Sequence, residues 1–220
     1  MRSWMIALLA LSLLAPAVPA ARLHGTIRVP GGSHDDPAFH PYAGHASSMA
    51  GHAMAERGAL GDAVLYLESV PAAADSALPA PVARPKLAQK DQSFVPRVVV
   101  VPVGGTVDFP NMDPIYHNVF SVSPVKRFDL GKYPRGESRS VRFPRAGLVN
   151  VYCDIHSDMA AFILVVPNRA FARPRADGGW ELPDVPPGRY VLCWWHPDFP
   201  GGRREIEVGD RDDAVVDVNF

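Results

Sequence analysis

The stretch VYCDIHSDMAAF, residues 151–162, spaces three possible metal ligands evenly along the chain. Cys153, His156 and Met159 lie three residues apart in each case. The preceding segment GLVNVYC alternates in polarity, which predicts a β-strand whose buried face ends at Cys153. The following segment AAFILVVP predicts another strand, so the three residues are expected to share one tight loop between two strands.

A fourth candidate ligand lies upstream in NMDPIYHNVFS, where His117 begins another predicted strand. With His117, the set holds two imidazoles, one thiolate and one thioether. Soft sulfur combined with imidazole selects copper, and a trigonal His₂Cys set with a weak axial Met is the ligand set of a blue-copper site. The sequence therefore predicts one type 1 copper site formed by His117, Cys153, His156 and Met159.

The rest of the chain predicts an all-β protein. Its 23 prolines and 18 glycines divide 220 residues into short segments. Around the candidate ligands, no segment of useful length shows the periodicity of a helix. FVPRVVVVPVGGTVDFPN predicts two strands around the turn at 104–105, and ESRSVRF predicts another. Several short strands with turn signals between them indicate a sandwich or a Greek-key barrel.

The stretch from about residue 87 to 167 resembles a cupredoxin. Its C-x2-H-x2-M loop, from Cys153 to Met159, is similar to the short ligand loop of amicyanin. The HNV segment at 117–119 resembles the upstream ligand motif of plastocyanin-like proteins. The resemblance implies a Greek-key β-sandwich that binds copper through the four residues named above.

The same resemblance implies roles for residues beside the ligands. Asn118 is implied to form a hydrogen bond that braces the ligand loop. His156 is implied to expose a ring edge through which electrons pass. Ala160, Ala161 and Phe162 are expected to form an apolar rim for a transient redox partner of the cytochrome or dehydrogenase type.

The segments on either side resemble a second sandwich of the transthyretin-like, carboxypeptidase regulatory-like kind. The first carries HGTIRVPGG and DAVLYLES, and the second carries a DG turn followed by PPG-x-Y and further short strands. The whole arrangement is similar to exported methylamine utilisation-type proteins. It implies a cupredoxin inserted in, or joined to, the second sandwich.

The implied division of the chain has five parts. They are a signal peptide (1–20), the first strands of the second sandwich (21–70), a Pro/Ala-rich linker (71–86), the cupredoxin domain (87–167) and the remainder of the second sandwich (168–220). In the alternative layout, strands within 23–70 complete the cupredoxin and only a small sandwich follows it.

The first twenty residues predict export. Arg2 precedes an apolar run and a small-residue site that ends at Ala20, as in a secretory signal peptide. The expected location is the periplasm or the exterior, with no membrane span in the mature form. The net charge of −1 offers no basic patch for nucleic acid.

Export leaves a second interpretation open for the two cysteines. Outside the cytoplasm, cysteines usually pair, so a Cys153–Cys193 disulfide is the alternative to copper binding. Such a disulfide would not explain why His117, His156 and Met159 accompany Cys153. Cys193 is expected to be a small buried apolar residue, and His196 is expected to be structural.

A loop at 34–54 is rich in His and Met, which bind copper in both oxidation states. It is either a copper-acquisition arm or a plain polar insertion. The principal prediction is an electron carrier that is not an enzyme. The alternatives are a copper storage or delivery protein that uses this loop, and a non-metal binding module on a cupredoxin scaffold.

Overall fold

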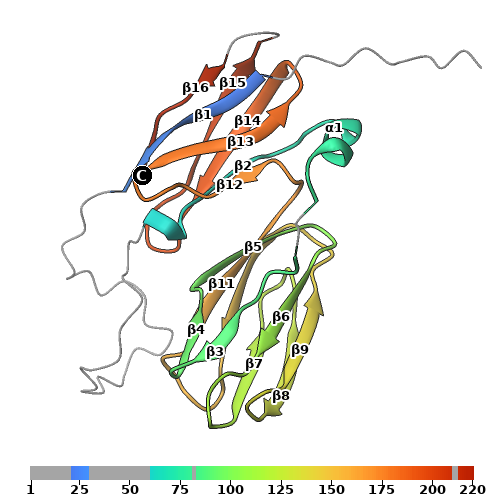
Figure 1. Cartoon of the computed structure of the whole chain (residues 1–220), viewed down its shortest axis with the longest axis vertical. Coiled ribbons are helices and arrows are strands. Elements are labelled where there is room, and N and C mark those ends of the chain that lie inside the picture. Colours follow the sequence, from blue (N-terminus) through green and yellow to red (C-terminus); the bar gives the residue numbers. More distant parts are fainter. Residues whose placement is uncertain (1–20, 30–59, 81–82, 210–212) are drawn as a thin grey trace, which may run out of the picture.

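The computed structural model describes residues 21–29, 60–80, 83–209 and 213–220. The predicted signal peptide at 1–20 and the His/Met-rich loop at 34–54 lie outside this part of the chain. Two β-rich bodies are visible in Figure 1, one built from the green and yellow middle of the chain and one from its blue and orange-to-red ends.

The predicted all-β architecture is confirmed. The strands are β1 (Ala21–Arg28), β2 (Val64–Leu67), β3 (Ala88–Lys90), β4 (Ser93–Val95), β5 (Val98–Pro102), β6 (Thr106–Pro110), β7 (His117–Ser121), β8 (Phe128–Tyr133), β9 (Ser138–Arg142), β10 (Gly147–Tyr152), β11 (Ala160–Val166), β12 (Phe171–Ala172), β13 (Gly179–Val185), β14 (Gly188–Trp195), β15 (Gly202–Val208), β16 (Ala214–Val215) and β17 (Val218–Asn219). Two short helices accompany them, η1 (Leu60–Asp62) and α1 (Ala72–Ala77). Within the described residues, neither helix has the length and the apolar character that crossing a membrane requires.

The strands β3–β11 form what we call the central sandwich. One sheet has the order β5-β11-β10-β7-β8, and the pairs β6–β9 and β3–β4 lie opposite it. Alternating residues of both layers fill a core that includes Phe109, Val119, Phe143, Val149 and Val151, each fully buried. This alternation is why the period-2 pattern of the sequence predicted these strands.

The other strands form what we call the flanking sandwich. One of its sheets has the order β13-β1-β16, with β17 also on β1, and the other has the order β12-β2-β14-β15. The strands β1 and β2 therefore pair with strands from the C-terminal part, and in the described structure neither pairs with the central sandwich. This pairing differs from the layout in which strands within 23–70 complete the cupredoxin. The boundaries of the five predicted parts stay a prediction.

Part of the segment predicted as a linker is ordered against the flanking sandwich. The helix α1 lies within it, and Leu78 just after the helix is buried in the flanking core. Asp75 accepts a hydrogen bond from the backbone N–H of Arg169 at 2.7 Å. Proline and alanine content indicated a linker, but a run of alanine after Pro71 also favours a short helix.

Three strands of the central sandwich were absent from the sequence-based expectation. The strand β8 carries a glycine and two charged residues at the edge of its sheet, so it lacks the apolar pattern that predicts a strand. The strands β3 and β4 have three residues each and join through Asp91 and Gln92, whose φ angles are both +53°. Segments this short show no period.

Arg97 connects the two sandwiches. Its guanidinium donates two hydrogen bonds to Asp198, at 2.6 and 2.7 Å, and one to Asp62 at 3.3 Å. The same group lies 5.6 Å from the centre of the Phe162 ring, and that ring packs edge-on against Trp195 at 5.9 Å. Bidentate pairing at a site largely shielded from water makes this contact stronger than an ordinary surface ion pair.

Arg97→Ala is expected to lower the free energy of unfolding by about 2 kcal/mol, because it removes the guanidinium that donates hydrogen bonds to both shielded carboxylates. Urea denaturation followed by tryptophan fluorescence measures this loss. Arg22→Ala is the matched control, since its pair with Glu181 is 3.8 Å long and 66% and 49% exposed; its cost should stay below about 0.5 kcal/mol. Equal effects of the two substitutions would contradict the role given to Arg97.

Candidate metal centre

The predicted ligand loop connects β10 to β11. Tyr152 at the end of β10 pairs with Ala160 at the start of β11, so the residues between them form a closed turn. Inside this turn, the Cys153 N–H donates to the Met159 carbonyl at 3.3 Å, and the Met159 N–H donates to the His156 carbonyl at 3.1 Å. These bonds hold the loop against two strands that are themselves fixed by the core.

The loop meets the first residue of the neighbouring strand β7. His117 Nδ1 lies 3.1 Å from His156 Nδ1, and Cys153 Sγ lies 3.9 Å from His156 Nδ1. The three side chains together form a group whose donor atoms all lie within 4.8 Å of one another. His117 is fully buried, Cys153 is 6% exposed, and His156 is only half-buried.

The fourth predicted ligand, Met159, lies at the end of the same loop. It is 1% exposed and belongs to the same core cluster as Cys153. The structure therefore brings three of the predicted residues together as a cluster of donor atoms. The fourth predicted ligand, Met159, is buried in the hydrophobic core beside these donor atoms.

The donor set, and the two separations measured from His156 Nδ1, fit a single metal ion. Protein nitrogen and sulfur ligands lie about 2.0 and 2.3 Å from a bound first-row metal, so two nitrogens on one ion are at most roughly 4.0 Å apart and a nitrogen–sulfur pair at most roughly 4.3 Å. The 3.1 and 3.9 Å separations fall within these limits. Thiolate and imidazole together suit copper, zinc or iron, and a buried methionine beside them favours copper.

A carboxylate that the sequence-based prediction missed contacts the buried histidine. Asp113 Oδ2 lies 2.7 Å from His117 Nε2, and both residues are almost entirely buried. A carboxylate is an acceptor, so the ring N–H at Nε2 donates to it. In the neutral ring, this leaves the lone pair of Nδ1 directed toward His156 and the cluster.

Asn111 organises the segment that carries Asp113. Its side-chain oxygen accepts the N–H of Asp113 at 2.9 Å, and its amide donates to the carbonyls of Ile115 and Tyr133, each at 2.9 Å. The first of these bonds is an Asx turn, in which a side chain binds the backbone two residues on. In the sequence, the Asn-x-Asp pattern at 111–113 is the one feature that could have indicated this turn.

The environment shifts the pKa of two groups at the centre. Burial raises the pKa of Asp113, but hydrogen bonds from Gln92, His117 and Asp91 outweigh burial, and the net shift is downward. Burial and the neighbouring His117 lower the pKa of His156, although Asp113 opposes this. At neutral pH, Asp113 is therefore ionised and His156 is neutral, which is the form of imidazole that binds a metal.

Asn118 has a different partner from the one expected. Its amide donates to Asp129 on β8 at 2.7 Å, and its side-chain oxygen is buried without a hydrogen-bond partner. The expected brace to the ligand loop is therefore wrong for this side chain. The carboxylate that accepts the hydrogen bond from this amide belongs to the edge strand β8, which the sequence did not predict.

The expected apolar rim also needs correction. Ala161 and Phe162 are buried within β11, at 1% and 7% exposure, because β11 lies between β5 and β10 in the sheet. The exposed apolar side chains near the cluster belong instead to its two loops. They are Met112, Ile115, Tyr116 and Ile155, which are 39–58% exposed.

The second cysteine does not pair with the first. Both Cys153 and Cys193 are free and buried, so the disulfide alternative is not what the structure shows. Burial, followed by the nearby Glu68, raises the pKa of Cys193, as expected for an inert thiol. His196 packs against Phe199 and Phe220 in the flanking sandwich, in keeping with the structural role expected of it.

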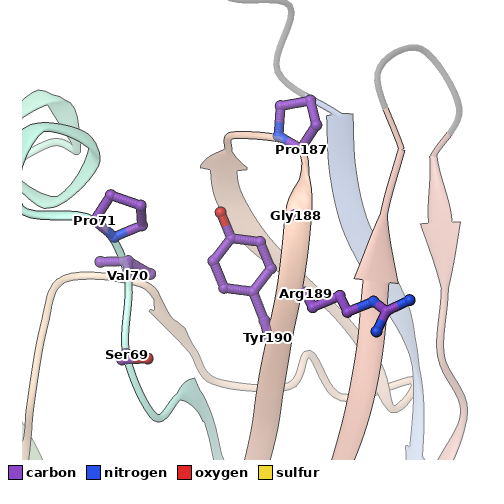
Figure 2. A pocket seen from close by; sticks show the side chains of 7 residues that line it. All are labelled: Ser69, Val70, Pro71, Pro187, Gly188, Arg189 and Tyr190. Carbon is purple, nitrogen blue, oxygen red and sulfur yellow. The ribbon is translucent and has the colours of Figure 1, made fainter.

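A hollow on the flanking sandwich lies apart from the cluster (Figure 2). The Tyr190 ring faces it, and the Tyr190 hydroxyl donates to the Pro186 carbonyl at 2.7 Å. The lining consists of Ser69, Val70, Pro71, Pro187, Gly188, Arg189 and Tyr190. None of the predicted metal ligands lines it.

The sequence matches no protein-family model and no curated protein. Among solved structures, a purple cupredoxin from Nitrosopumilus maritimus is 20% identical, and the match covers 37% of this chain and 98% of that chain, with a TM-score of 0.34. A reduced Cu(I) form of amicyanin is 21% identical over 47% of this chain and 98% of that chain, with a TM-score of 0.36.

A Cu-containing nitrite reductase from Thermus scotoductus SA-01 is 27% identical over 41% of this chain, with a TM-score of 0.37. That match covers 26% of the reductase chain. Each of these likenesses covers less than half of the present chain. The resemblance to methylamine utilisation-type proteins and the identity of the flanking sandwich stay predictions.

Proposed function

We propose that this chain is an exported type 1 copper protein that carries single electrons between redox partners. The observation that supports this most directly is the cluster of His117, Cys153 and His156, with donor atoms within 4.8 Å of one another beside a buried methionine. This combination of thiolate, imidazoles and thioether is the donor set that selects copper for electron transfer.

Each residue has a distinct role in this proposal. The Cys153 thiolate and the Nδ1 atoms of His117 and His156 hold the ion, and Met159 supplies a weak fourth donor from the core. When bound, copper supplies a one-electron Cu(II)/Cu(I) couple. The chain's own contribution is to hold the donors rigidly between sheet strands, so that little has to move when the charge changes.

The burial of the donors supports an electron carrier and not an enzyme. His117, Cys153 and Met159 are each at most 6% exposed, which leaves a substrate little access from their side. His156 alone among the four is half-buried, so its ring edge offers a route for electrons to the surface. Catalytic metal sites, by contrast, usually keep a coordination position open to a substrate.

The exposed apolar side chains in the two loops support a transient partner. Met112, Ile115 and Tyr116 precede His117, and Ile155 precedes His156. A small apolar surface of this kind suits brief contact with a redox protein of the cytochrome or dehydrogenase type. Export to the periplasm, through the predicted signal peptide, is part of the same proposal.

The test is cyclic voltammetry of residues 21–220 with one equivalent of copper. We expect one reversible wave that transfers one electron per chain, because the donors are held in place in both oxidation states. The copper-free chain is the control and should give no wave. A chain that binds copper but shows no reversible wave would contradict electron transfer and favour copper storage or delivery.

A further inference from the structure

The contact between Asp113 and His117 has a feature that copper binding alone does not require. His117 needs only its Nδ1 atom for the cluster, yet its other nitrogen is bound to a carboxylate at 2.7 Å. The side chains of the two residues are 6% and 0% exposed. Placing a carboxylate this deep is costly unless hydrogen bonds compensate it.

Those compensating bonds come from a different part of the chain. The N–H of Asp91 donates to Asp113 Oδ1 at 2.6 Å, and the N–H of Gln92 donates to Asp113 Oδ2 at 2.9 Å. Both donors lie in the β3–β4 turn, where positive φ angles direct consecutive amides the same way. The Asx turn at Asn111 holds Asp113 from a second segment. Two separate segments therefore fix the Asp113 carboxylate against the His117 ring.

We propose that Asp113 is a positioning residue of the metal centre, which fixes the His117 tautomer and makes its Nδ1 a stronger donor that favours Cu(II) over Cu(I). The inference rests on the proposed function for its copper preference, but not for the tautomer. A carboxylate that accepts the outer N–H of a ligating imidazole both orients the ring and raises its basicity.

The preference for Cu(II) follows from charge. A more basic imidazole and a buried negative group nearby both stabilise the ion of higher charge, and little water is present to screen them. Other acidic residues near the loop are not placed in this way. Asp154, for example, is exposed, and its side chain lies 3.8 Å from Lys132.

Nitrogen-15 NMR of the copper-free chain with labelled histidine tests the first half of the proposal without any metal. We expect the hydrogen of the neutral His117 ring to lie on Nε2, because Asp113 Oδ2 accepts it there. A hydrogen on Nδ1, or rapid exchange between the two nitrogens, would overturn the proposal while leaving the proposed function intact. This measurement uses the unmodified chain, so it does not depend on how any variant folds.

Asp113→Asn tests the second half, because asparagine keeps an oxygen that can accept the ring N–H but loses the charge. We expect the ratio of Cu(II) to Cu(I) affinity to fall about tenfold, equivalent to a rise in reduction potential of about 59 mV for one electron. Asp154→Asn removes an exposed charge as the matched control and should leave the ratio nearly unchanged. Equal ratios in both variants would overturn the proposal.

The two proposals fail in different ways. If the unmodified chain forms no thiolate–copper complex, the proposed function fails, and the NMR measurement still decides the tautomer. If the complex forms but Asp113→Asn leaves the affinity ratio as it is in the unmodified chain, only the role of Asp113 fails.

Discussion

Cys153→Ser is expected to weaken Cu(II) binding by more than about a hundredfold. Losing a residue that merely supports a ligand already costs 10- to about 100-fold in metal affinity, and Cys153 supplies the donor atom itself. Serine is close in size, so the loop between β10 and β11 should keep its shape while it loses the soft thiolate. Competition with a chelator of known affinity measures the change.

Cys193→Ser is the matched control for this substitution. Cys193 is also free and buried, but it lies on β14 of the flanking sandwich, and among the described residues it belongs to no group of possible metal donors. Its replacement should leave copper affinity unchanged within about twofold. If the two cysteine variants bind copper equally well, the thiolate is not a ligand and the account of the centre is wrong.

Asn111→Ala is expected to lower the free energy of unfolding by about 3 kcal/mol. The side chain is 2% exposed and makes three hydrogen bonds, which its removal would leave as unpaired buried groups. Each such orphaned group costs about 1–3 kcal/mol, and partial relaxation reduces the sum. Because the same bonds shape the segment before His117, copper affinity should also fall, by about tenfold.

Asn118→Ala provides a close comparison, since this asparagine is also 2% exposed and lies beside the same cluster. It makes one hydrogen bond, to the exposed Asp129, and its own oxygen already lacks a partner. Its removal should cost about 1 kcal/mol or less. Thermal and urea unfolding of both variants measure the difference, and a larger loss for Asn118→Ala would show that the buried network is misassigned.

The features that the sequence predicted are those encoded over short distances. The alternation through Val149 and Val151 to Cys153 predicted both the strand and the inward direction of the thiol. The spacing of Cys153, His156 and Met159 required only one loop to bring them together. His117 was predicted from its place at the start of an alternating segment, and the resemblance to cupredoxins supplied its relation to the loop.

The features that the sequence did not predict depend on contacts between distant segments. Asp113 receives hydrogen bonds from Asp91 and Gln92, about twenty residues earlier, and no local pattern marks such a contact. The partner of Asn118 lies on an edge strand too polar to be recognised. Phe162 was expected at the surface because it follows the ligand loop, but its strand is covered by β5 and the flanking sandwich.

Whether the Cys153 thiolate binds copper is decided by the visible absorption spectrum of residues 21–220 during titration with Cu(II). We expect an intense band from thiolate-to-copper charge transfer that reaches its maximum at one equivalent and is absent from Cys153→Ser. A colourless chain, or a spectrum that is the same with serine at position 153, would contradict the type 1 site and leave a non-metal binding module as the better account.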